Sequence, residues 1–160
     1  MSYSRDRDET CFRLCKMQAR LFERSSVEGI PSYFFVKSFV ATQYARKMDE
    51  LTIFDEVYSE DEIFQNVKKR INIRRGTVYS PAVMHWIGYL LREWSYRYNT
   101  YTSLILKDVS LDYLAGVYQP YHSLDVLKAI KLIAIDRGIN LDITPEERLR
   151  KILLKTMPIF

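Results

Sequence analysis

The chain has 160 residues, of which 48% are apolar and 28% are charged. That length suits one domain with its own core, and the composition excludes a disordered chain and one that lies mostly within a membrane. The formal net charge of +4 permits a nucleic-acid partner, but a typical nucleic-acid-binding domain concentrates far more positive charge on one face.

The N-terminal residues and the two cysteines indicate the compartment. Residues 1–10 are charged and lack the apolar core of a signal peptide. The sequence has no apolar run that approaches the roughly 20 residues needed to span a bilayer. Cys11 and Cys15 are four residues apart, on one face of a helix, which is typical of an intracellular thiol pair and not of a disulfide framework. We therefore expect a cytoplasmic protein.

Helical periodicity predicts an all-α fold along the first half of the chain. Residues 9–24 have a mostly apolar stripe at helical spacing, made of Phe12, Cys15, Ala19 and Phe22. Residues 31–48 follow as a second helix, which opens on proline and serine. Ser59 and Glu62 match a capping box, so a third helix is expected from there to about residue 70. A small hairpin over residues 71–78 is left open as an alternative.

The second half of the chain continues the helical pattern. Ser80 is expected to cap a strongly aromatic helix that runs to about Tyr98 and has proline at its first position. Shorter helices are expected near residues 103–107 and 111–114. An irregular loop that carries tyrosines follows over residues 116–122.

Two further helices complete the prediction. The helix that Ser123 is expected to cap is apolar almost all round, which places it in the middle of the fold, and Gly138 ends it. Residues 145–156 form a basic C-terminal helix that we interpret as an extension. The sequence therefore predicts a single helical domain over residues 1–160, with roughly six to eight helices.

One face of the aromatic helix combines an imidazole, two phenols and a guanidinium at helical spacing: His85, Tyr89, Arg92 and Tyr96. Such a stripe can grip an anion, a nucleotide or a peptide carboxylate. The same residues also suit an amphipathic rim, whose apolar stems cover neighbours while the polar tips stay in water. Gly88 lies inside this helix at a cost of about 1 kcal/mol relative to alanine. We expect another helix or backbone to approach it closely.

A second candidate site is the turn over residues 116–125, which leads into a helix start. Free N–H groups at such a start favour anions. One interpretation is a recognition loop built from Tyr118, Tyr121 and His122. The other is a packed, hydrogen-bonded turn in which Ser123 caps the helix and Asp125 complements its dipole.

Charge is unevenly distributed in the middle of the chain. Seven carboxylates and no base lie between residues 49 and 62, whereas five bases and no acid lie between residues 68 and 75. Acids at the start of a helix and bases at its end complement the helix dipole, which explains much of this pattern. The alternative is a docking surface in which the bases contact nucleic acid. These bases are Lys68, Lys69, Arg70, Arg74 and Arg75.

Catalytic motifs give little support to an enzyme. The sequence has no phosphate-binding glycine loop, no G-x-S-x-G elbow and no H-E-x-x-H. The cysteines and histidines lack the pair spacing of a zinc site, so no metal or other cofactor is expected and no catalytic residue is assigned. A metal-independent enzyme that acts on a phosphate-containing substrate through His85 and His122 stays open, and it needs the two rings close together.

Three stretches of the sequence share motifs with a known group of proteins. Residues 32–40, followed by Met48 and Asp49, are similar to an F-[IV]-x-x-F-[MV] segment that ends in M-D. Residues 85–89 read H-W-I-G-Y and are similar to Y-W-I-G-Y, and residues 114–125 are similar to L-x-G-x-Y-x-x-Y-H-[ST]-L-D. Over about residues 32–135 the chain thus resembles a small family of uncharacterised bacterial helical proteins, whose genes tend to lie beside an ADP-ribosyltransferase-like toxin gene.

The resemblance implies a place in a toxin–antitoxin or phage-defence module. We expect an antitoxin-like, non-catalytic binding subunit that contacts an ADP-ribosyltransferase-like protein from the same operon. Its contact residues would come from the stripe and the loop, because tyrosine and arginine are enriched at interface hot spots. The alternative is a nucleic-acid or nucleotide-binding module that uses the five bases, with tyrosines as stacking platforms.

Overall fold

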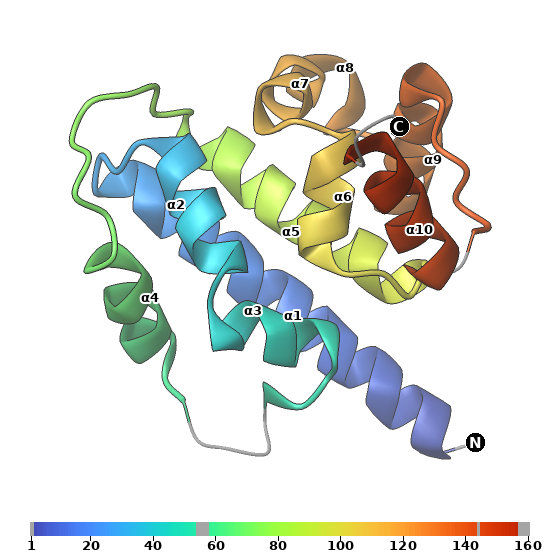
Figure 1. Cartoon of the computed structure of the whole chain (residues 1–160). Coiled ribbons are helices and arrows are strands. Elements are labelled where there is room, and N and C mark those ends of the chain that lie inside the picture. Colours follow the sequence, from blue (N-terminus) through green and yellow to red (C-terminus); the bar gives the residue numbers. More distant parts are fainter. Residues whose placement is uncertain (1, 54–57, 144, 157–160) are drawn as a thin grey trace.

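The structure is a computed structural model of the whole chain, and it describes residues 2–53, 58–143 and 145–156 (Figure 1). Within these ranges the chain is helical or irregular and contains no strand, which confirms the all-α prediction. The alternative hairpin over residues 71–78 is wrong, because this stretch contains no strand and has a bend at Gly76. None of the helices in the described ranges is both long and apolar enough to cross a membrane.

The helices follow one another along the chain, and residues 69–80 join α4 to α5 without a helix. Their bounds are α1 Ser2–Val27, α2 Ser32–Val40, α3 Gln43–Asp49, α4 Glu60–Lys68, α5 Pro81–Arg97, α6 Thr102–Asp108, α7 Leu111–Gly116, α8 Tyr118–Tyr121, α9 Val126–Arg137 and α10 Pro145–Thr156. There are more segments than expected, because the chain between residues 31 and 49 is divided into α2 and α3 and the loop after α7 contains the single turn α8.

The two longest helices, α1 and α5, pack against each other in antiparallel directions (Figure 1). Glu23 near the end of α1 meets His85 near the start of α5, and the Tyr96 hydroxyl at the other end donates to Asp8. A Cβ added at Gly88 would lie 2.8 Å from the carbonyl oxygen of Gln18, so only glycine permits this spacing. The expected close approach of a helix at Gly88 is confirmed.

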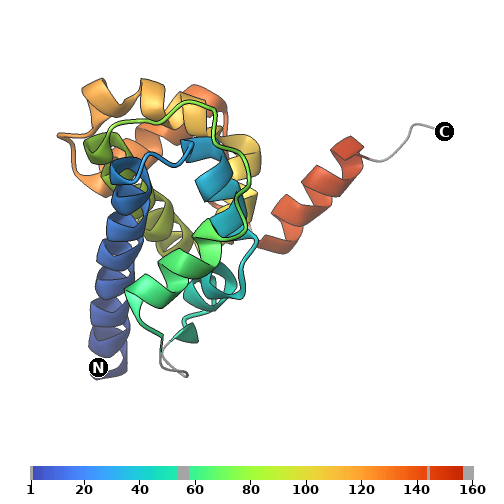
Figure 2. The same cartoon turned by 90° about the vertical axis from the view of Figure 1, so that its left-hand side faces the viewer.

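The other helices cover this pair from two sides. Helices α2 and α4 contact α1, whereas α6, α7 and α9 contact α5. Aromatic rings fill the core on the first side, where Phe22 packs edge-on against Phe35 and Phe39, and Phe64 lies 5.7 Å from Phe35 between centroids. Figure 2 shows that α10 projects away from the rest of the molecule. Its described leucines are exposed.

Polar side chains mark the helix starts. Ser59, Ser80 and Ser110 each accept a hydrogen bond from a backbone N–H in the first turn, as capping predicts. Thr42 starts α3 in the same way and also donates to the carbonyl of Phe39. This competition for backbone groups divides the helix that we expected to run unbroken to residue 48.

The structure corrects three expectations about the helices. Asp125, not Ser123, caps α9, because its carboxylate accepts from the N–H groups of Leu127 and Lys128. Helix α9 lies at the periphery and not in the middle of the fold, since only one face packs against α5 and Ile135 is 75% exposed. Phe12 is 51% exposed and therefore does not belong to the buried stripe of α1.

Candidate functional site

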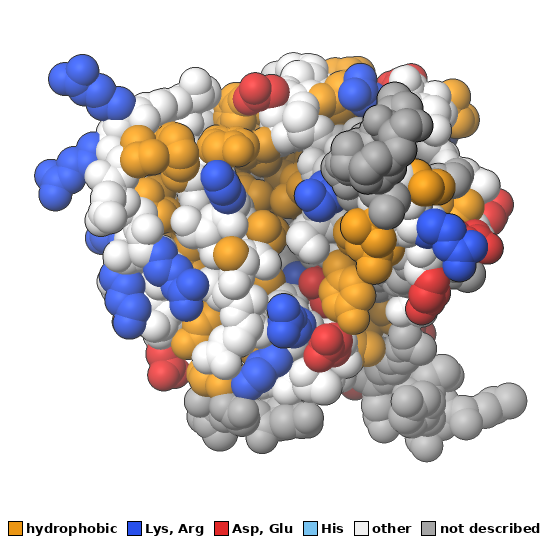
Figure 3. Space-filling model, viewed as in Figure 1, with side chains coloured by type: hydrophobic (Ala, Val, Ile, Leu, Met, Phe, Trp, Pro, Cys, Tyr) orange, Lys and Arg blue, Asp and Glu red, His pale blue; other side chains and the backbone are white. Residues whose placement is uncertain are grey.

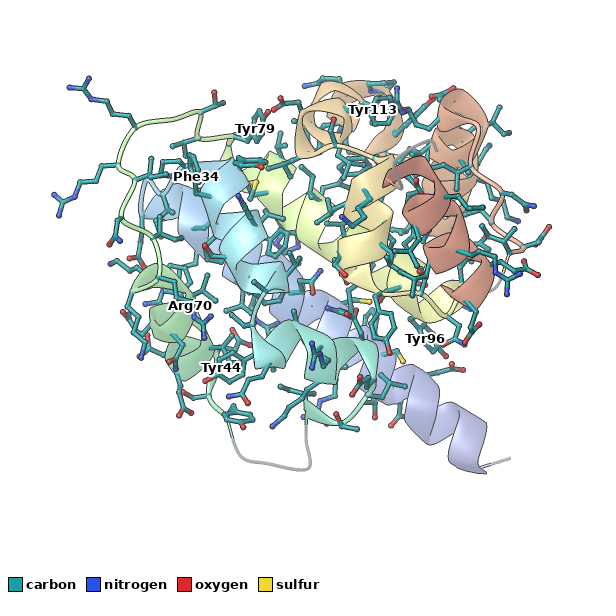
Figure 4. All side chains as sticks on the ribbon, in the orientation of Figure 1. Phe34, Tyr44, Arg70, Tyr79, Tyr96 and Tyr113 are labelled. Carbon is teal, nitrogen blue, oxygen red and sulfur yellow. The ribbon has the colours of Figure 1, made fainter. Side chains whose placement is uncertain are left out.

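The predicted stripe on α5 turns toward α1 and is not a free surface. The Nδ1 atom of His85 lies 3.2 Å from a Glu23 carboxylate oxygen, and the Tyr89 ring packs edge-on against Phe12. Tyr96, labelled in Figure 4, reaches the N-terminal part of α1 through its hydroxyl. Most of the stripe therefore forms the rim of the α1–α5 packing, with polar tips at the surface.

Arg92, the fourth member of the stripe, is buried, with a side chain only 2% exposed. Its guanidinium donates to Asp49 Oδ1 at 2.5 Å, to Gln18 Oε1 at 2.7 Å and to Ser95 Oγ at 3.2 Å. Asp49 Oδ1 also accepts from the hydroxyl of Thr102 at 2.9 Å. This network joins α1, α3, α5 and α6, and so Arg92 serves the packing and cannot contact a partner in this conformation.

A cavity beside the Arg92–Asp49 pair is too small for a substrate. It has a volume of about 20 Å³ and is lined in part by Leu51 and Asn99, which both have positive φ angles. A cavity of this size holds about one water molecule. The surroundings of Arg92 are therefore structural.

The second predicted site, on the turn before α9, forms an aromatic stack against α5. The rings of Tyr118 and His122 are stacked with centroids 4.3 Å apart, and Tyr118 meets Trp86 edge-on at 5.7 Å. His122 is exposed, Tyr118 is half-buried and Trp86 is buried. The stack thus leads from the core to solvent.

Hydrogen bonds determine which nitrogen of His122 carries a proton. Nδ1 lies 2.8 Å from the carbonyl oxygen of Tyr118 and 3.1 Å from that of Gln119. Carbonyl oxygens only accept, so Nδ1 is the donor. In the neutral ring, Nε2 is then an acceptor, and it can take a hydrogen bond from a partner.

Tyr121 faces a different neighbour from its companions in the loop. Its hydroxyl donates to Asp136 Oδ2 at 2.6 Å, and Tyr113, labelled in Figure 4, donates to the same atom at 3.0 Å. These two bonds lower the pKa of Asp136. Burial and the bond to Asp136 raise the pKa of Tyr113 to about 12. Both phenols are therefore held as donors that tie α7 and α8 to α9.

Tyr89 follows Trp86 by about one turn on α5. Burial raises the pKa of Tyr89 to about 12, and the nearby Cys15, Glu93 and Asp125 raise it further. We call Trp86, Tyr89, Tyr118 and His122 the aromatic surface. One of these residues, Trp86, was not predicted as a site residue, although it belongs to the H-W-I-G-Y motif.

His85 and His122 do not form a shared site. His85 contacts Glu23 on α1, whereas His122 contacts Tyr118 and Gln119, and no contact between the two rings occurs in the described part of the chain. Among the residues described, no group of three or more histidine, cysteine or acidic side chains is placed to hold a metal ion. The geometry therefore offers no acid–base pair of the kind that the enzyme alternative needs.

The five predicted bases lie at the end of α4 and along the segment that follows it. Lys68 pairs with Glu28, with Nζ and Oε1 2.9 Å apart. The other four are exposed and make no ion pair within the described residues. Figure 3 shows lysine and arginine side chains along this edge of the molecule. The structure brings these bases together but places them on other elements than the aromatic surface.

An apolar groove that was not expected from the sequence lies between α2 and the α6–α7 region. It has a volume of about 360 Å³, and its lining includes Tyr33, Val36, Val40, Leu106 and Leu111. Apolar side chains in its area are visible in Figure 3. The sequence of α2 could have indicated this groove, because the helix has more apolar residues than its buried face uses. One of them, Tyr33, is 57% exposed.

No protein-family model, curated protein or solved structure matches this chain.

Proposed function

We propose that this protein is a non-catalytic binding subunit that contacts another protein through the aromatic surface. The observation that carries this proposal is the stack of Trp86, Tyr118 and His122, which runs from the core to solvent. Rings that are already fixed lose little conformational entropy on binding, so such a surface suits a protein interface. The Nε2 atom of His122 and the hydroxyls of Tyr89 and Tyr118 provide polar tips around the rings.

We further propose that the partner is an ADP-ribosyltransferase-like protein of a toxin–antitoxin or phage-defence module, encoded in the same operon. This part of the proposal is supported by the resemblance of residues 32–49, 85–89 and 114–125 to a family found beside such toxins. Two of these motifs, W-I-G-Y and Y-H-S-L-D, supply residues of the aromatic surface. A role in binding the neighbouring protein explains why they meet in space.

The test is co-purification of the tagged protein with the products of its neighbouring genes. We expect a stoichiometric partner to elute with the wild-type protein. The double variant Tyr118→Ala, His122→Ala should lose it, because both rings of the exposed end of the stack are removed. Circular dichroism should remain helical, since neither residue is buried.

The matched control is Tyr33→Ala, which removes an exposed tyrosine from α2, outside the aromatic surface. This variant should retain the partner. A wild-type protein that elutes alone would contradict the proposed partner. Retention of the partner by the double variant would show that the aromatic surface is not the interface.

A further inference from the structure

The segment between α4 and α5 has an unusual backbone. Residues 72–75 are exposed and lie outside any helix, and a bend follows at Gly76. Figure 1 shows this segment running as an open stretch from α4 to α5. The backbone N–H and C=O groups of residues 72–76 make no hydrogen bond within the described residues. An extended strand with unpaired groups is a ready template for pairing with another chain. Water can satisfy these groups, so the segment is stable alone and still open to a partner.

Both ends of this segment are attached to the fold. At its start, the N–H of Ile71 donates to the carbonyl of Lys68 at 3.1 Å. At its end, the carbonyl of Thr77 accepts from the N–H of Ser32 at 2.9 Å, and the Tyr79 N–H donates to the Ser32 hydroxyl. Gly76 packs so closely on Pro31 that an added Cβ would lie 3.0 Å from the proline Cβ. The free stretch is therefore held at both ends in an extended form.

The charges around the segment are not balanced. Two arginines of α1 neutralise the acidic start of α4, because Arg20 pairs with Glu60 and Arg24 pairs with Asp61. Asp55 and Glu56, two members of the acidic run in the sequence, lie outside the described residues. Within the described residues, Lys68 at the end of α4 pairs with Glu28, but the four bases that follow it have no ion pair. The uncompensated bases are Lys69, Arg70, Arg74 and Arg75.

An open groove lies beside the segment and has a volume of about 550 Å³. Ile71 and Ile73 line it together with Pro31, and Lys69 and Arg74 supply cations to its lining. Glu28 also lines it, but its charge is already paired with Lys68 and Arg24, and these bonds lower the pKa of Glu28. The groove thus combines an aliphatic surface with net positive charge.

We propose that residues 71–76 form a docking site for an extended acidic segment of another protein. The ligand adds as a strand along the free backbone, which supplies the hydrogen bonds, and its carboxylates face Lys69, Arg70, Arg74 and Arg75. The aliphatic side chains of the groove contact every second side chain of the ligand strand. This site shares no residue with the aromatic surface, so it is a second interaction surface beyond the proposed function.

A polypeptide fits this site better than a nucleic acid does. The free backbone offers both donors and acceptors, and a strand pairs with both, whereas phosphate oxygens only accept. Proteins that bind single-stranded nucleic acid place aromatic rings under the bases. Among the described residues, those that line this groove are aliphatic, polar or charged and include no aromatic ring. The Phe34 ring lies beside Gly76, at the end of the segment, and does not line the groove.

The test uses a fluorescent peptide of alternating valine and glutamate with the full-length, isotope-labelled protein. Binding is measured by fluorescence anisotropy, and its location by NMR chemical shifts. We expect the amide signals of residues 72–76 to shift. The same peptide N-methylated at every residue keeps its charge but loses the N–H groups of both edges, so it should bind at least about tenfold more weakly.

Charge variants separate this surface from the rest of the molecule. The double variant Arg74→Glu, Arg75→Glu should also bind the peptide at least about tenfold more weakly. The double variant Lys128→Glu, Lys131→Glu makes the same charge change on α9 and should bind the peptide as the wild type does. Equal binding of the N-methylated peptide, or shifts confined to other residues, overturns the proposal. Tighter binding of a thymidine oligonucleotide to residues 72–76 also overturns it, in favour of nucleic acid. Co-purification with the operon partner tests the proposed function and not this docking site, so either proposal can fail while the other holds.

Discussion

The Arg92 guanidinium and the Asp49 carboxylate form a buried ion pair, with side chains only 2% and 6% exposed. The two residues are far apart in sequence, on α5 and at the end of α3. Gln18 and Thr102 complete the hydrogen bonding of the two charged groups. Because both charges are removed from water, each depends on the other to remain in the core.

Replacement of Arg92 by methionine should therefore destabilise the fold strongly. The variant keeps the apolar stem but leaves the Asp49 carboxylate buried without its cation. We expect a loss of about 3 to 5 kcal/mol in the free energy of unfolding. Urea denaturation followed by circular dichroism measures this change.

The control for this prediction is Arg20→Met on α1. Arg20 and its partner Glu60 have side chains that are 50% and 37% exposed, so the loss of this pair should cost less than about 1 kcal/mol. Similar costs for the two variants would contradict the role assigned to the buried pair.

Gly88→Ala should destabilise the protein although alanine favours helices. The new methyl group would meet the Gln18 carbonyl oxygen and the Ala19 Cα at 2.8 and 3.0 Å, which forces α1 and α5 apart. We expect a net loss of about 1 to 3 kcal/mol, since overpacking outweighs the helix-propensity gain of about 1 kcal/mol. Thermal unfolding measures the change.

Gly116→Ala is the matched control for Gly88→Ala. It also lies in a helix, but an added Cβ would meet no atom within 4 Å. This variant should be as stable as the wild type or slightly more stable. A neutral effect at Gly88 would mean that the two helices can separate at little cost.

Local chemistry explains which parts of the fold the sequence predicted. Ser59 and Ser80 cap helices, and Gly138 ends α9 with a left-handed φ of 65°. Each of these features depends on a side chain and the backbone within a few residues of it. The start of α9 was placed wrongly because Ser123 and Asp125 are both good caps, and the geometry of the preceding turn decides between them.

Long-range contacts explain what the sequence did not reveal. The spacing of Arg92 matched an exposed stripe, and its burial depends on Asp49, which lies on another helix. Phe12 fits an apolar stripe, but the approach of α1 to Gly88 sets the face of α1 that is buried and leaves Phe12 exposed. The candidate site was found in part, since the motif of Tyr118 and His122 was visible while its contact with Trp86 was not.

The two cysteines are free, as predicted, and both are buried in the α1–α5 packing. Burial raises the pKa of Cys15, and the nearby Glu93 raises it further. The thiolate is the reactive form, so neither cysteine should react with iodoacetamide at neutral pH until urea unfolds the protein. Mass spectrometry of the alkylated protein checks this expectation.

Lys16→Cys provides the control, because it places a thiol at an exposed position on the same helix. This thiol should be alkylated in the native protein while the two natural ones are not. Alkylation of Cys11 or Cys15 at the rate of the introduced thiol would show that α1 separates from α5 in solution.

The phenol of Tyr113 should make stability fall at alkaline pH. Burial, and then its bond to Asp136, raise its pKa from 10.0 to about 12. The folded state thus holds the proton more tightly than the unfolded state. Its contribution to stability is fully present below pH 10 and is lost as the pH rises toward 12.

Tyr113→Phe should therefore lose less stability than the wild type between pH 10 and 12. Urea denaturation at several pH values across this window measures the slope of the unfolding free energy. Asp136→Asn should give an intermediate slope, because burial still raises the pKa of Tyr113 but the carboxylate no longer does. Equal slopes for the wild type and Tyr113→Phe would mean that the Tyr113 phenol titrates alike in the folded and unfolded chains, and that its bond to Asp136 does not hold α7 to α9.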